Sequence, residues 1–232
     1  MATLYVVATP IGNLKDITLR ALEVLRSVDL ILCEDTRVTQ KLLNHFGIKT
    51  RTQSYHQHSK LKKVNYILKL LREGKNLALV SDAGTPGISD PGNKLIEKIT
   101  ETRSLEVEII PIPGPSALTT AASIAGVSMN RFLFLGFPPQ KRKRKKFFKE
   151  VINSKYPVIF YESPYRILKT LNELKLSYYH CHGSLNTTLQ VVVCRELTKK
   201  FETVYRGNIE EVIEKIKEDK AKGEFVVIIS PK

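Results

Sequence analysis

The segment NLALVSDAGTPGISDPG (residues 76–92) joins an apolar, strand-like run to a loop rich in residues with special backbone properties. The loop, residues 80–92, contains three glycines, two prolines and two aspartates. A simple reversal of the chain needs only one or two such residues. Glycine permits positive φ angles and close approach to the main chain, whereas proline holds the backbone rigid. This segment therefore predicts a loop shaped around a ligand at the end of a strand.

The first half of the chain, which contains this segment, alternates strand-like and helical runs. Runs rich in β-branched residues predict strands, and apolar residues at helical spacing predict amphipathic helices between them. The expected strands cover residues 3–10, 30–35, 52–58, 76–82 and 107–113, and the expected helices cover 17–28, 36–47, 60–74 and 92–102. Such alternation is typical of a mostly parallel sheet covered by helices, in which ligands bind at the carboxyl ends of the strands.

The second half of the chain has a different pattern, and a domain boundary is expected near residue 117. Helices are expected at 113–129, 164–175 and 209–223, and strands at 131–137, 156–163, 189–197, 201–207 and 224–230. Strands 189–197 and 201–207 are so close in sequence that they predict a hairpin. The fold class is therefore α/β with two α/β domains, residues 1–117 with a mostly parallel sheet and residues 118–232 with a mixed sheet.

The overall composition indicates a folded, reduced protein. Of the 232 residues, 42% are hydrophobic and 26% are charged, which is the balance of a soluble domain. No apolar run approaches the roughly 20 residues of a membrane-spanning helix, and MATLYVVATP at the N-terminus lacks the pattern of a signal peptide. Three scattered cysteines do not suggest a disulfide framework. We expect a cytoplasmic protein with no membrane partner.

The charge of the chain points to an anionic partner. Lys and Arg number 37 against 23 Asp and Glu, a formal net charge of +14. Six consecutive basic residues precede two phenylalanines, Phe147 and Phe148, whose side chains are expected to face the core. Because adjacent like charges repel, a phosphate-bearing partner is the simpler explanation for the run. The run consists of Lys141, Arg142, Lys143, Arg144, Lys145 and Lys146.

The residues that follow four of the first domain's expected strands resemble the 80–92 loop in composition. They are ATPIGNLKD (8–16), EDTR (34–37), SDAGTPGISDPG (81–92) and PIPGPSA (111–117). One such end is ordinary for a tight turn, but four at the same edge of a parallel sheet indicate backbone shaped around a ligand. The crevice is expected to contain backbone groups, prolines, and the carboxylates of Asp35, Asp82 and Asp90.

Several familiar site motifs are missing from the sequence. The chain contains no G-x-G-x-x-G motif, no P-loop and no G-x-S-x-G elbow. The HCH triplet at 180–182 has adjacent rather than spaced ligands, which favours a surface loop over a zinc site, and we expect no metal. His45, His56 and His58 are interpreted as polar-surface or partner-facing residues.

Six motifs carry a resemblance to a known family. They are residues 4–37, VSDAGTPGISDPG (80–92), PIPGPSA (111–117), FLFLGFPP (132–139), FYESPYRI (160–167) and CREL (194–197). In this order they resemble the ribosomal RNA small-subunit methyltransferase I family, which has the tetrapyrrole-methylase fold. The resemblance extends from about residue 3 to about residue 230 and departs from the family pattern at 177–188.

The resemblance implies an activity, a cofactor and partners. Members of the family use S-adenosylmethionine, bind it between two α/β domains, act as homodimers, and methylate the 2′-hydroxyl of a cytidine in the decoding centre of 16S rRNA. The partner implied is the small ribosomal subunit. The implied donor-binding residues are Pro10, Gly12, Ser81, Asp82, Ala83, Gly84, Thr85, Asp90, Pro91, Pro113, Gly114, Pro115 and Ser116, with Tyr161 and Arg195 in the second domain.

The reaction suggests candidates for a catalytic base. Positioning is expected to supply much of the acceleration, and a ribose hydroxyl benefits from a group that accepts its proton. The candidates are Glu34, Asp35 and Glu162; the alternative interpretation of each is pairing with a nearby arginine. Arg37 and the basic run are expected to contact rRNA phosphates, while the pocket takes up an unstacked nucleotide.

Two other functions fit parts of the sequence. The same fold could methylate a tetrapyrrole such as a corrin ring, although the net positive charge and the specific loop motifs disfavour this substrate. The chain could instead be a non-catalytic RNA-binding protein of ribosome assembly, although such a protein would not need a donor-shaped crevice.

Overall fold

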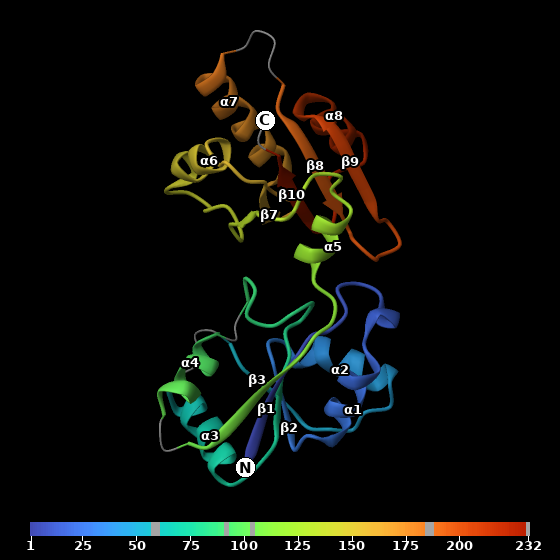
Figure 1. The fold of residues 1–232 in the computed structure, drawn as a ribbon. Helices are drawn as coiled ribbons and strands as arrows, with labels where there is room; N and C mark the ends of the chain where they lie inside the picture. Colours follow the sequence, from blue (N-terminus) through green and yellow to red (C-terminus); the bar gives the residue numbers. More distant parts are fainter. Residues whose placement is uncertain (57–60, 91–92, 103–104, 184–187, 231–232) are drawn as a thin grey trace. The chain divides into compact units, whose positions relative to one another are not determined.

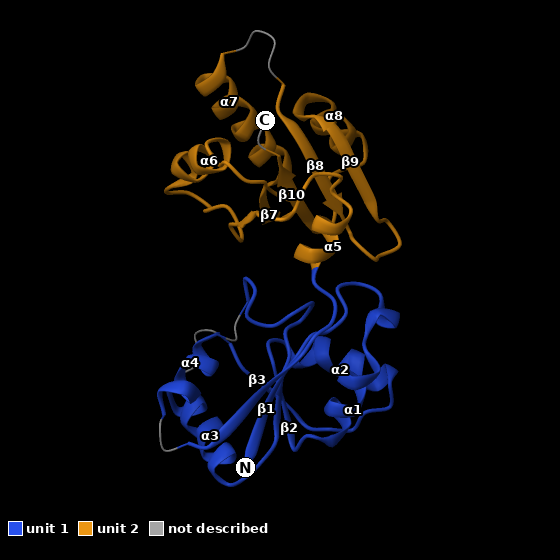
Figure 2. Cartoon of the chain, viewed as in Figure 1, with its two compact units in different colours: residues 1–116 blue, residues 117–232 orange. Residues whose placement is uncertain are grey.

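The computed structural model describes residues 1–56, 61–90, 93–102, 105–183 and 188–230. The chain divides into two compact units, Met1–Ser116 and Ala117–Lys232, shown in different colours in Figure 2. In the part of the chain that is described, no helix combines the length and apolar character that a membrane crossing requires.

Unit 1 is built on a five-stranded sheet in the order β3-β2-β4-β1-β5, and every strand pair in it is parallel. In β1, Leu4 lies opposite Leu77 of β4 and Ile109 of β5. The parallel sheet expected from the strand–helix alternation is therefore confirmed. The strands are β1 (Ala2–Val7), β2 (Leu30–Cys33), β3 (Thr52–Ser54), β4 (Leu77–Leu79) and β5 (Val107–Ile112).

Two pairs of helices cover opposite faces of this sheet (Figure 1). Helices α1 (Leu19–Ser27) and α2 (Thr36–His45) pack on one face, and α3 (Leu61–Arg72) and α4 (Asn93–Glu101) pack on the other. Successive strand residues point to opposite faces, and β1, β2, β4 and β5 each contribute to both cores. In β2, for example, Ile31 and Cys33 belong to the α1–α2 core, while Leu32 belongs to the α3–α4 core.

The strand order of unit 1 places a topological switch at β1 and β4. The chain moves outward from β1 to β2 and β3, then returns to insert β4 between β2 and β1 before adding β5 at the other edge. In open parallel sheets, ligands bind outside the carboxyl ends of the strands where the order reverses. The loops that follow β1 and β4 therefore lie at the expected position for a site.

Unit 2 contains a second five-stranded sheet, in the order β6-β7-β10-β8-β9. Among the described strands of this sheet, β6 and β7 pair in parallel and the other neighbours pair antiparallel, so the sheet is mixed, as expected. Strands β8 and β9 pair antiparallel with Arg195 opposite Thr203, which confirms the predicted hairpin. The strands are β6 (Leu133–Phe134), β7 (Val158–Glu162), β8 (Gln190–Arg195), β9 (Thr203–Asn208) and β10 (Phe225–Ile229).

The core of unit 2 forms between its sheet and helices α6 (Arg144–Ile152), α7 (Ile167–His182) and α8 (Ile209–Glu218). Phe147 and Phe148 are both buried in this core, as expected from the sequence. The cations beside them therefore begin a helix whose apolar face is packed inward.

Several elements of unit 2 differ in length from the sequence expectation; α8, for example, ends at Glu218 rather than at residue 223. The expected helix 113–129 is confined to α5 (Ala117–Ser123), because prolines precede it, and the expected strand 131–137 pairs only over β6. Conversely, α7 continues to His182, because Leu174 and Tyr178 extend its buried stripe. The HCH triplet lies in the last turn of α7 rather than in a surface loop, so its side chains point in different directions around the helix.

Candidate active site

The loops after β1 and β4 are joined by main-chain hydrogen bonds. The Thr9 amide donates to the Gly84 carbonyl at 2.9 Å, and the Gly84 amide donates to the Thr9 carbonyl at 3.0 Å. The Thr9 hydroxyl also donates to the Ser81 carbonyl at 3.2 Å. These contacts hold the two loops in one arrangement at the switch point of the sheet.

The loop after β5 closes on the same point. The Thr85 hydroxyl donates to the Pro115 carbonyl at 3.2 Å. Gly84 has a φ of +81°, and a Cβ added there would lie 3.3 Å from Ile11 Cγ2. At Gly114 an added Cβ would lie 3.0 Å from the Ala8 Cβ. At both positions an added side chain would therefore be crowded by a neighbouring side chain, and at Gly84 it would also meet an unfavourable positive φ.

Asp82 connects this cluster to the end of β2. Its Oδ1 accepts a hydrogen bond from the Asp35 amide at 2.9 Å. Asp35 caps the N-terminus of α2 and pairs with Arg37, whose Nη2 lies 2.6 Å from Oδ2. The hydrogen bonds from Arg37 lower the pKa of Asp35 to about 2. The Asp35 carboxylate is therefore ionised and already hydrogen-bonded to Arg37, which makes it a weak proton acceptor.

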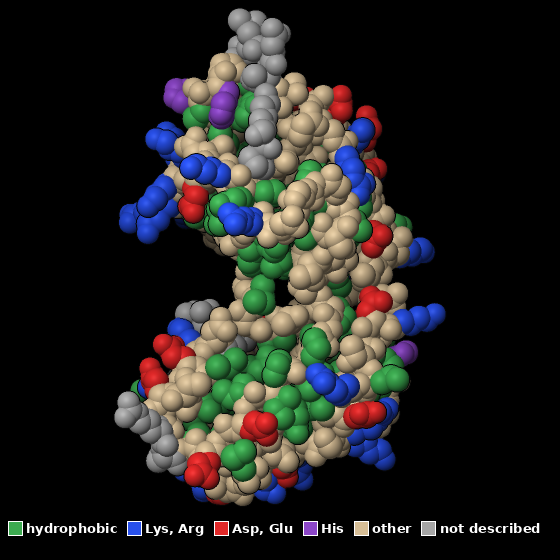
Figure 3. Space-filling view, in the orientation of Figure 1, with side chains coloured by type: hydrophobic (Ala, Val, Ile, Leu, Met, Phe, Trp, Pro, Cys, Tyr) green, Lys and Arg blue, Asp and Glu red, His purple; other side chains and the backbone are tan. Residues whose placement is uncertain are grey.

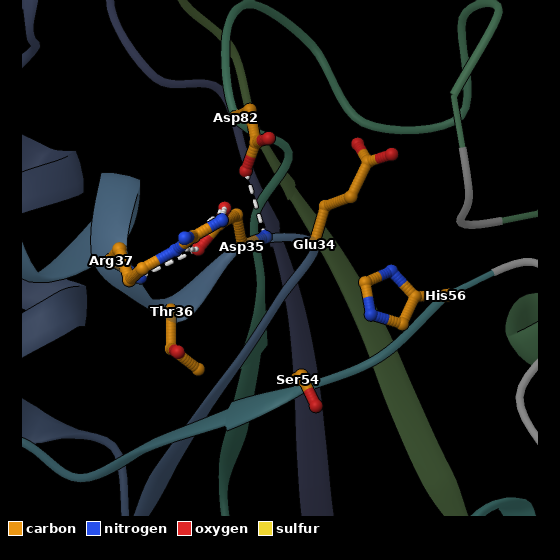
Figure 4. A pocket seen from close by; sticks show the side chains of 7 residues that line it. All are labelled: Glu34, Asp35, Thr36, Arg37, Ser54, His56 and Asp82. Atoms are coloured by element: carbon orange, nitrogen blue, oxygen red, sulfur yellow. Dashed lines mark hydrogen bonds and ion pairs between the residues drawn. The ribbon is translucent and has the colours of Figure 1, made fainter.

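A pocket of about 430 Å³ opens beside Asp82 (Figure 4). Its lining comes from the ends of β2, β3 and β4. In Figure 4 the Glu34 side chain points away from the Asp35–Arg37 pair and extends between Asp82 and His56. The lining residues are Glu34, Asp35, Thr36, Arg37, Ser54, His56 and Asp82.

A smaller cavity of about 200 Å³ also reaches Asp82. Thr9, Pro10 and Ser81 contribute the loop side of this cavity. Its opposite side is mostly apolar, with Leu14, Val38 and Leu42. Unit 1 thus presents a polar pocket and a more apolar one that share one carboxylate.

Glu34 has the electrostatic environment of a proton acceptor. Partial burial raises the pKa of Glu34, and the negative charges of Asp82 and Asp90 raise it further. Burial also raises the pKa of Asp90, whose Oδ1 accepts a hydrogen bond from the Gly87 amide. A carboxylate with a raised pKa is a stronger base than an ordinary one. Of the two adjacent carboxylates, the geometry therefore favours Glu34 over Asp35.

The remaining donor candidates of unit 1 lie on the same loops. Pro10 is buried, and Ser116 is half-buried. Gly12, Ala83, Pro113 and Gly114 are exposed. Pro91 lies outside the described residues. The structure thus gathers these loop positions at one edge of the sheet, and their contact with a donor stays a prediction.

Glu162 does not have the environment of a catalytic base. Its side chain is fully buried at the end of β7, and Arg166 Nη2 lies 2.8 Å from Oε1. Oε2 accepts a hydrogen bond from the Thr170 hydroxyl at 2.6 Å, and Oε1 accepts one from the Ser163 amide at 2.7 Å. These contacts fit the arginine-partner interpretation of Glu162, and a role as a base stays a prediction.

Arg144 is the exception in the basic run. Its guanidinium is buried and donates to Glu173 Oε2 at 2.7 Å, to the Pro139 carbonyl at 2.8 Å and to the Thr170 hydroxyl at 2.9 Å. These contacts occupy its donors inside unit 2, so Arg144 is unsuited to binding phosphate. The other five cations of the run are exposed, and Figure 3 shows Lys and Arg side chains along the α6 edge of unit 2.

The two donor candidates of unit 2 are held by their own neighbours. The Tyr161 ring contacts Phe134 and Phe137 edge-on, with centroids 4.9 and 5.5 Å away. Arg195 Nε donates to the Lys222 carbonyl at 2.7 Å, which ties the end of β8 to the loop before β10. A donor-binding role for either residue stays a prediction.

Sequence reasoning missed part of the pocket. His56, interpreted from the sequence as a polar-surface or partner-facing residue, is exposed, and it lines the pocket together with Ser54 and Thr36, which the sequence did not single out. Ser54 and His56 lie at the end of β3, the one strand of unit 1 to which the strand-end argument was not applied. Their polar character at a strand end was the signal that could have identified them.

Comparison with known proteins gives consistent matches. The family model for Tetrapyrrole (Corrin/Porphyrin) Methylases matches residues 3–213. Ribosomal RNA small subunit methyltransferase I of Thermotoga maritima is 42% identical over 100% of both chains. The protein of the same name from Escherichia coli O157:H7 is 45% identical over 97% of this chain and 77% of the relative.

Solved structures with low sequence identity share the fold. The cobalamin biosynthetic enzyme cobalt precorrin-4 methyltransferase superposes with a TM-score of 0.67 at 18% identity, covering 98% of this chain and 94% of the other. Uroporphyrin-III-C-methyltransferase from Thermus thermophilus gives a TM-score of 0.62 at 17% identity, with coverages of 97% and 93%. At these identities the likeness concerns the fold alone.

Proposed function

Because this chain belongs to the ribosomal RNA small subunit methyltransferase I family, within the tetrapyrrole (corrin/porphyrin) methylases, we propose that it methylates a ribose of 16S rRNA. The family resemblance inferred from the motifs is confirmed, as is its assignment to the methyltransferases. The proposed reaction transfers a methyl group from S-adenosylmethionine to the 2′-hydroxyl of a cytidine in the decoding centre.

The loops at the carboxyl ends of the unit 1 strands have features that suit this donor. Adenosylmethionine carries positive charge on its sulfonium and ammonium groups, and the carboxylates of Asp82 and Asp90 face the same end of the sheet as the pocket. Gly114 is exposed and has no side chain, so a donor could approach the main chain of its loop closely. Residues 81–85 and 113–116 would hold the donor, which when bound supplies a methyl group activated by positively charged sulfur.

The observation that carries the proposal is the position of Glu34 in the polar pocket. A ribose hydroxyl must lose its proton as its oxygen becomes methylated, and a positioned carboxylate can accept that proton. Glu34 lines the pocket with a raised pKa, whereas Asp35 beside it is paired with Arg37. Glu34 is therefore the proposed base, and the Asp35–Arg37 pair forms the adjoining wall.

Exposed cations would position the RNA. The Arg37 side chain is 86% exposed at the rim of the pocket. In unit 2, Lys141, Arg142, Lys143, Lys145 and Lys146 are exposed. Contacts of this kind bind phosphates without reading sequence, and their strength falls as salt rises.

We test the proposal by methyl transfer to small ribosomal subunits that lack this modification. The purified chain is incubated with radiolabelled adenosylmethionine, and label in 16S rRNA is mapped to the nucleotide. We expect label on the ribose of one cytidine. Glu34→Gln should reduce the rate by about 10²–10⁴-fold, the usual contribution of general base catalysis.

The control variant is Glu73→Gln, because Glu73 is half-exposed after α3, at the opposite edge of the sheet. This control should retain the wild-type rate. Donor binding without label on rRNA would favour a tetrapyrrole substrate, and RNA binding without donor binding would favour a non-catalytic assembly protein. From the family we also propose a homodimer acting in the cytoplasm, with the dimer tested by sedimentation.

A further inference from the structure

Unit 2 displays two exposed aromatic side chains, one just before the basic run and one just after β7. Phe137 is 51% exposed and Tyr165 is 96% exposed. A single exposed aromatic residue is common on protein surfaces. These two, however, belong to segments that the structure ties together through Arg166 and Pro138, and the Phe137 segment leads directly into the exposed cations of the basic run.

Two arginines fix the loop that carries Phe137. Arg166 Nη1 donates to the Pro138 carbonyl at 3.1 Å, and Arg144 Nη1 donates to the Pro139 carbonyl at 2.8 Å. Arg166 follows Tyr165 directly, so its contact also ties the Tyr165 segment to this loop. Both arginines are themselves anchored, Arg166 on Glu162 and Arg144 on Glu173.

The Phe137 ring is supported from below. It contacts the half-buried Tyr161 edge-on at 5.5 Å, and Tyr161 in turn contacts Phe134 at 4.9 Å. The Tyr161 amide donates to the Gly136 carbonyl at 2.9 Å, which continues the β6–β7 pairing up to the residue before Phe137. An exposed ring on a rigid support loses little conformational entropy when a flat ligand stacks on it.

We propose that Phe137 and Tyr165 form a stacking platform for unpaired bases of the RNA substrate. The inference rests on the proposed function, because it assigns a second contact region to the same substrate. Proteins that bind single-stranded nucleic acid combine aromatic rings, on which bases stack, with cations that follow the backbone. Here the loop runs from Phe137 straight into Lys141, Arg142 and Lys143, all exposed.

Charge complementarity selects RNA over a second copy of the chain as the occupant. A second copy seated on this surface by its own equivalent surface would bring five more cations against these five, and like charges repel. A nucleic acid strand supplies both flat rings and phosphates. The platform would hold unpaired nucleotides of the same RNA substrate.

The test compares two fluorescently labelled probes at one salt concentration. One is a single-stranded RNA of about 12 nucleotides, within the usual site size; the other is an abasic ribose–phosphate chain of the same length. The double variant Phe137→Ala/Tyr165→Ala should weaken RNA binding by about tenfold or more, as loss of base stacking does. It should bind the abasic chain like the wild type.

Two further variants make the test specific. Phe201→Ala is the matched control, since Phe201 is 66% exposed beside Lys200 in the same unit, away from the loop, and should bind both probes normally. Lys141→Ala should weaken both probes, because it removes charge rather than stacking. Tyr165→Ala alone removes almost no buried surface, so it provides the measurement if the double variant fails to fold.

Unchanged RNA binding by Tyr165→Ala and the double variant, or an equal loss on both probes, overturns the stacking platform. Loss of self-association rather than of RNA affinity overturns it also, by identifying a second copy as the occupant. If the wild type methylates subunits while the aromatic variants bind RNA normally, only this inference fails. Aromatic-dependent RNA binding by a wild type that transfers no methyl group would support the platform and refute the proposed function.

Discussion

Thr170→Val tests whether the buried polar network of unit 2 is structural or catalytic. Thr170 is fully buried in α7, donates to Glu162 Oε2 at 2.6 Å and accepts from Arg144 Nη2 at 2.9 Å. Valine has nearly the same shape but neither donates nor accepts a hydrogen bond. The substitution therefore removes two hydrogen bonds to charged groups without leaving a large cavity.

The expected cost follows from these two contacts. A hydrogen bond to a charged group contributes about 1.5–3 kcal/mol to stability. The lower figure applies to each, because Glu162 keeps Arg166 and the Ser163 amide, and Arg144 keeps Glu173 and the Pro139 carbonyl. The free energy of unfolding of unit 2 should therefore fall by about 3 kcal/mol. With a urea m-value of about 2 kcal/mol/M, the midpoint should fall by about 1.5 M.

The assay must report on unit 2 separately from unit 1, and the chain has no tryptophan for fluorescence. Hydrogen exchange of peptides from β7 and α7, followed by mass spectrometry over a urea series, gives the local unfolding free energy. The control is Thr100→Val, because the Thr100 hydroxyl is exposed in α4 and contacts only the Glu97 carbonyl of its own helix. Its midpoint should not change measurably.

The activity of the folded fraction completes this test. If the network is structural, Thr170→Val and Glu162→Gln should lose stability but keep the methyl-transfer rate per folded molecule. A base at Glu162 predicts the opposite for Glu162→Gln, a rate loss of about 10²–10⁴-fold with the fold retained. That second outcome, or a midpoint unchanged by Thr170→Val, refutes the reasoning.

Three further tests, which use five variants, probe other parts of the structure. Glu34→Gln should slow methyl transfer but should unfold no more easily than the wild type at neutral pH. Because folding raises the pKa of Glu34, the native state binds the Glu34 proton more tightly than the unfolded state does. The stability of the wild type relative to this variant should therefore fall as pH rises from the ordinary pKa of a glutamate through the raised one. Urea midpoints at pH 4 and pH 8 measure this, and a wild type that gains stability relative to the variant over that interval contradicts it. Gly84→Ala should lower the free energy of unfolding by about 1–3 kcal/mol because of the positive φ at this position, and crowding by Ile11 should lower it further. At Gly126 φ is also positive, but an added Cβ would meet no atom within 4 Å. Equal melting temperatures for Gly84→Ala and Gly126→Ala would show that crowding is unimportant. Lys145→Ala should reduce the slope of log affinity for RNA against log salt concentration by about 0.7. Arg144→Ala should leave this slope unchanged and should destabilise unit 2, because Arg144 pairs with Glu173. A change of slope with Arg144→Ala would show that the Arg144 side chain contacts phosphate.

Local patterns in the sequence were sufficient for the architecture. The alternation of strands and helices predicted the parallel sheet of unit 1, and the short gap between 189–197 and 201–207 predicted the β8–β9 hairpin. Both rest on periodicity and turn chemistry, which neighbouring residues determine. The rule that parallel strands end at one edge also predicted that the loops carrying Thr9, Gly84 and Pro115 meet, since it needs only the direction of each strand.

Only the tertiary structure decided what individual charged side chains do. Arg144 looks like its five neighbours in sequence, but its partners Thr170 and Glu173 lie 26 and 29 residues away on another helix. Likewise Glu34 and Asp35 are adjacent, yet one faces Asp82 and His56 while the other is held by Arg37. The role of a charge depends on its burial and on its nearest partners in space, and those partners are brought together by the packing of elements distant in sequence.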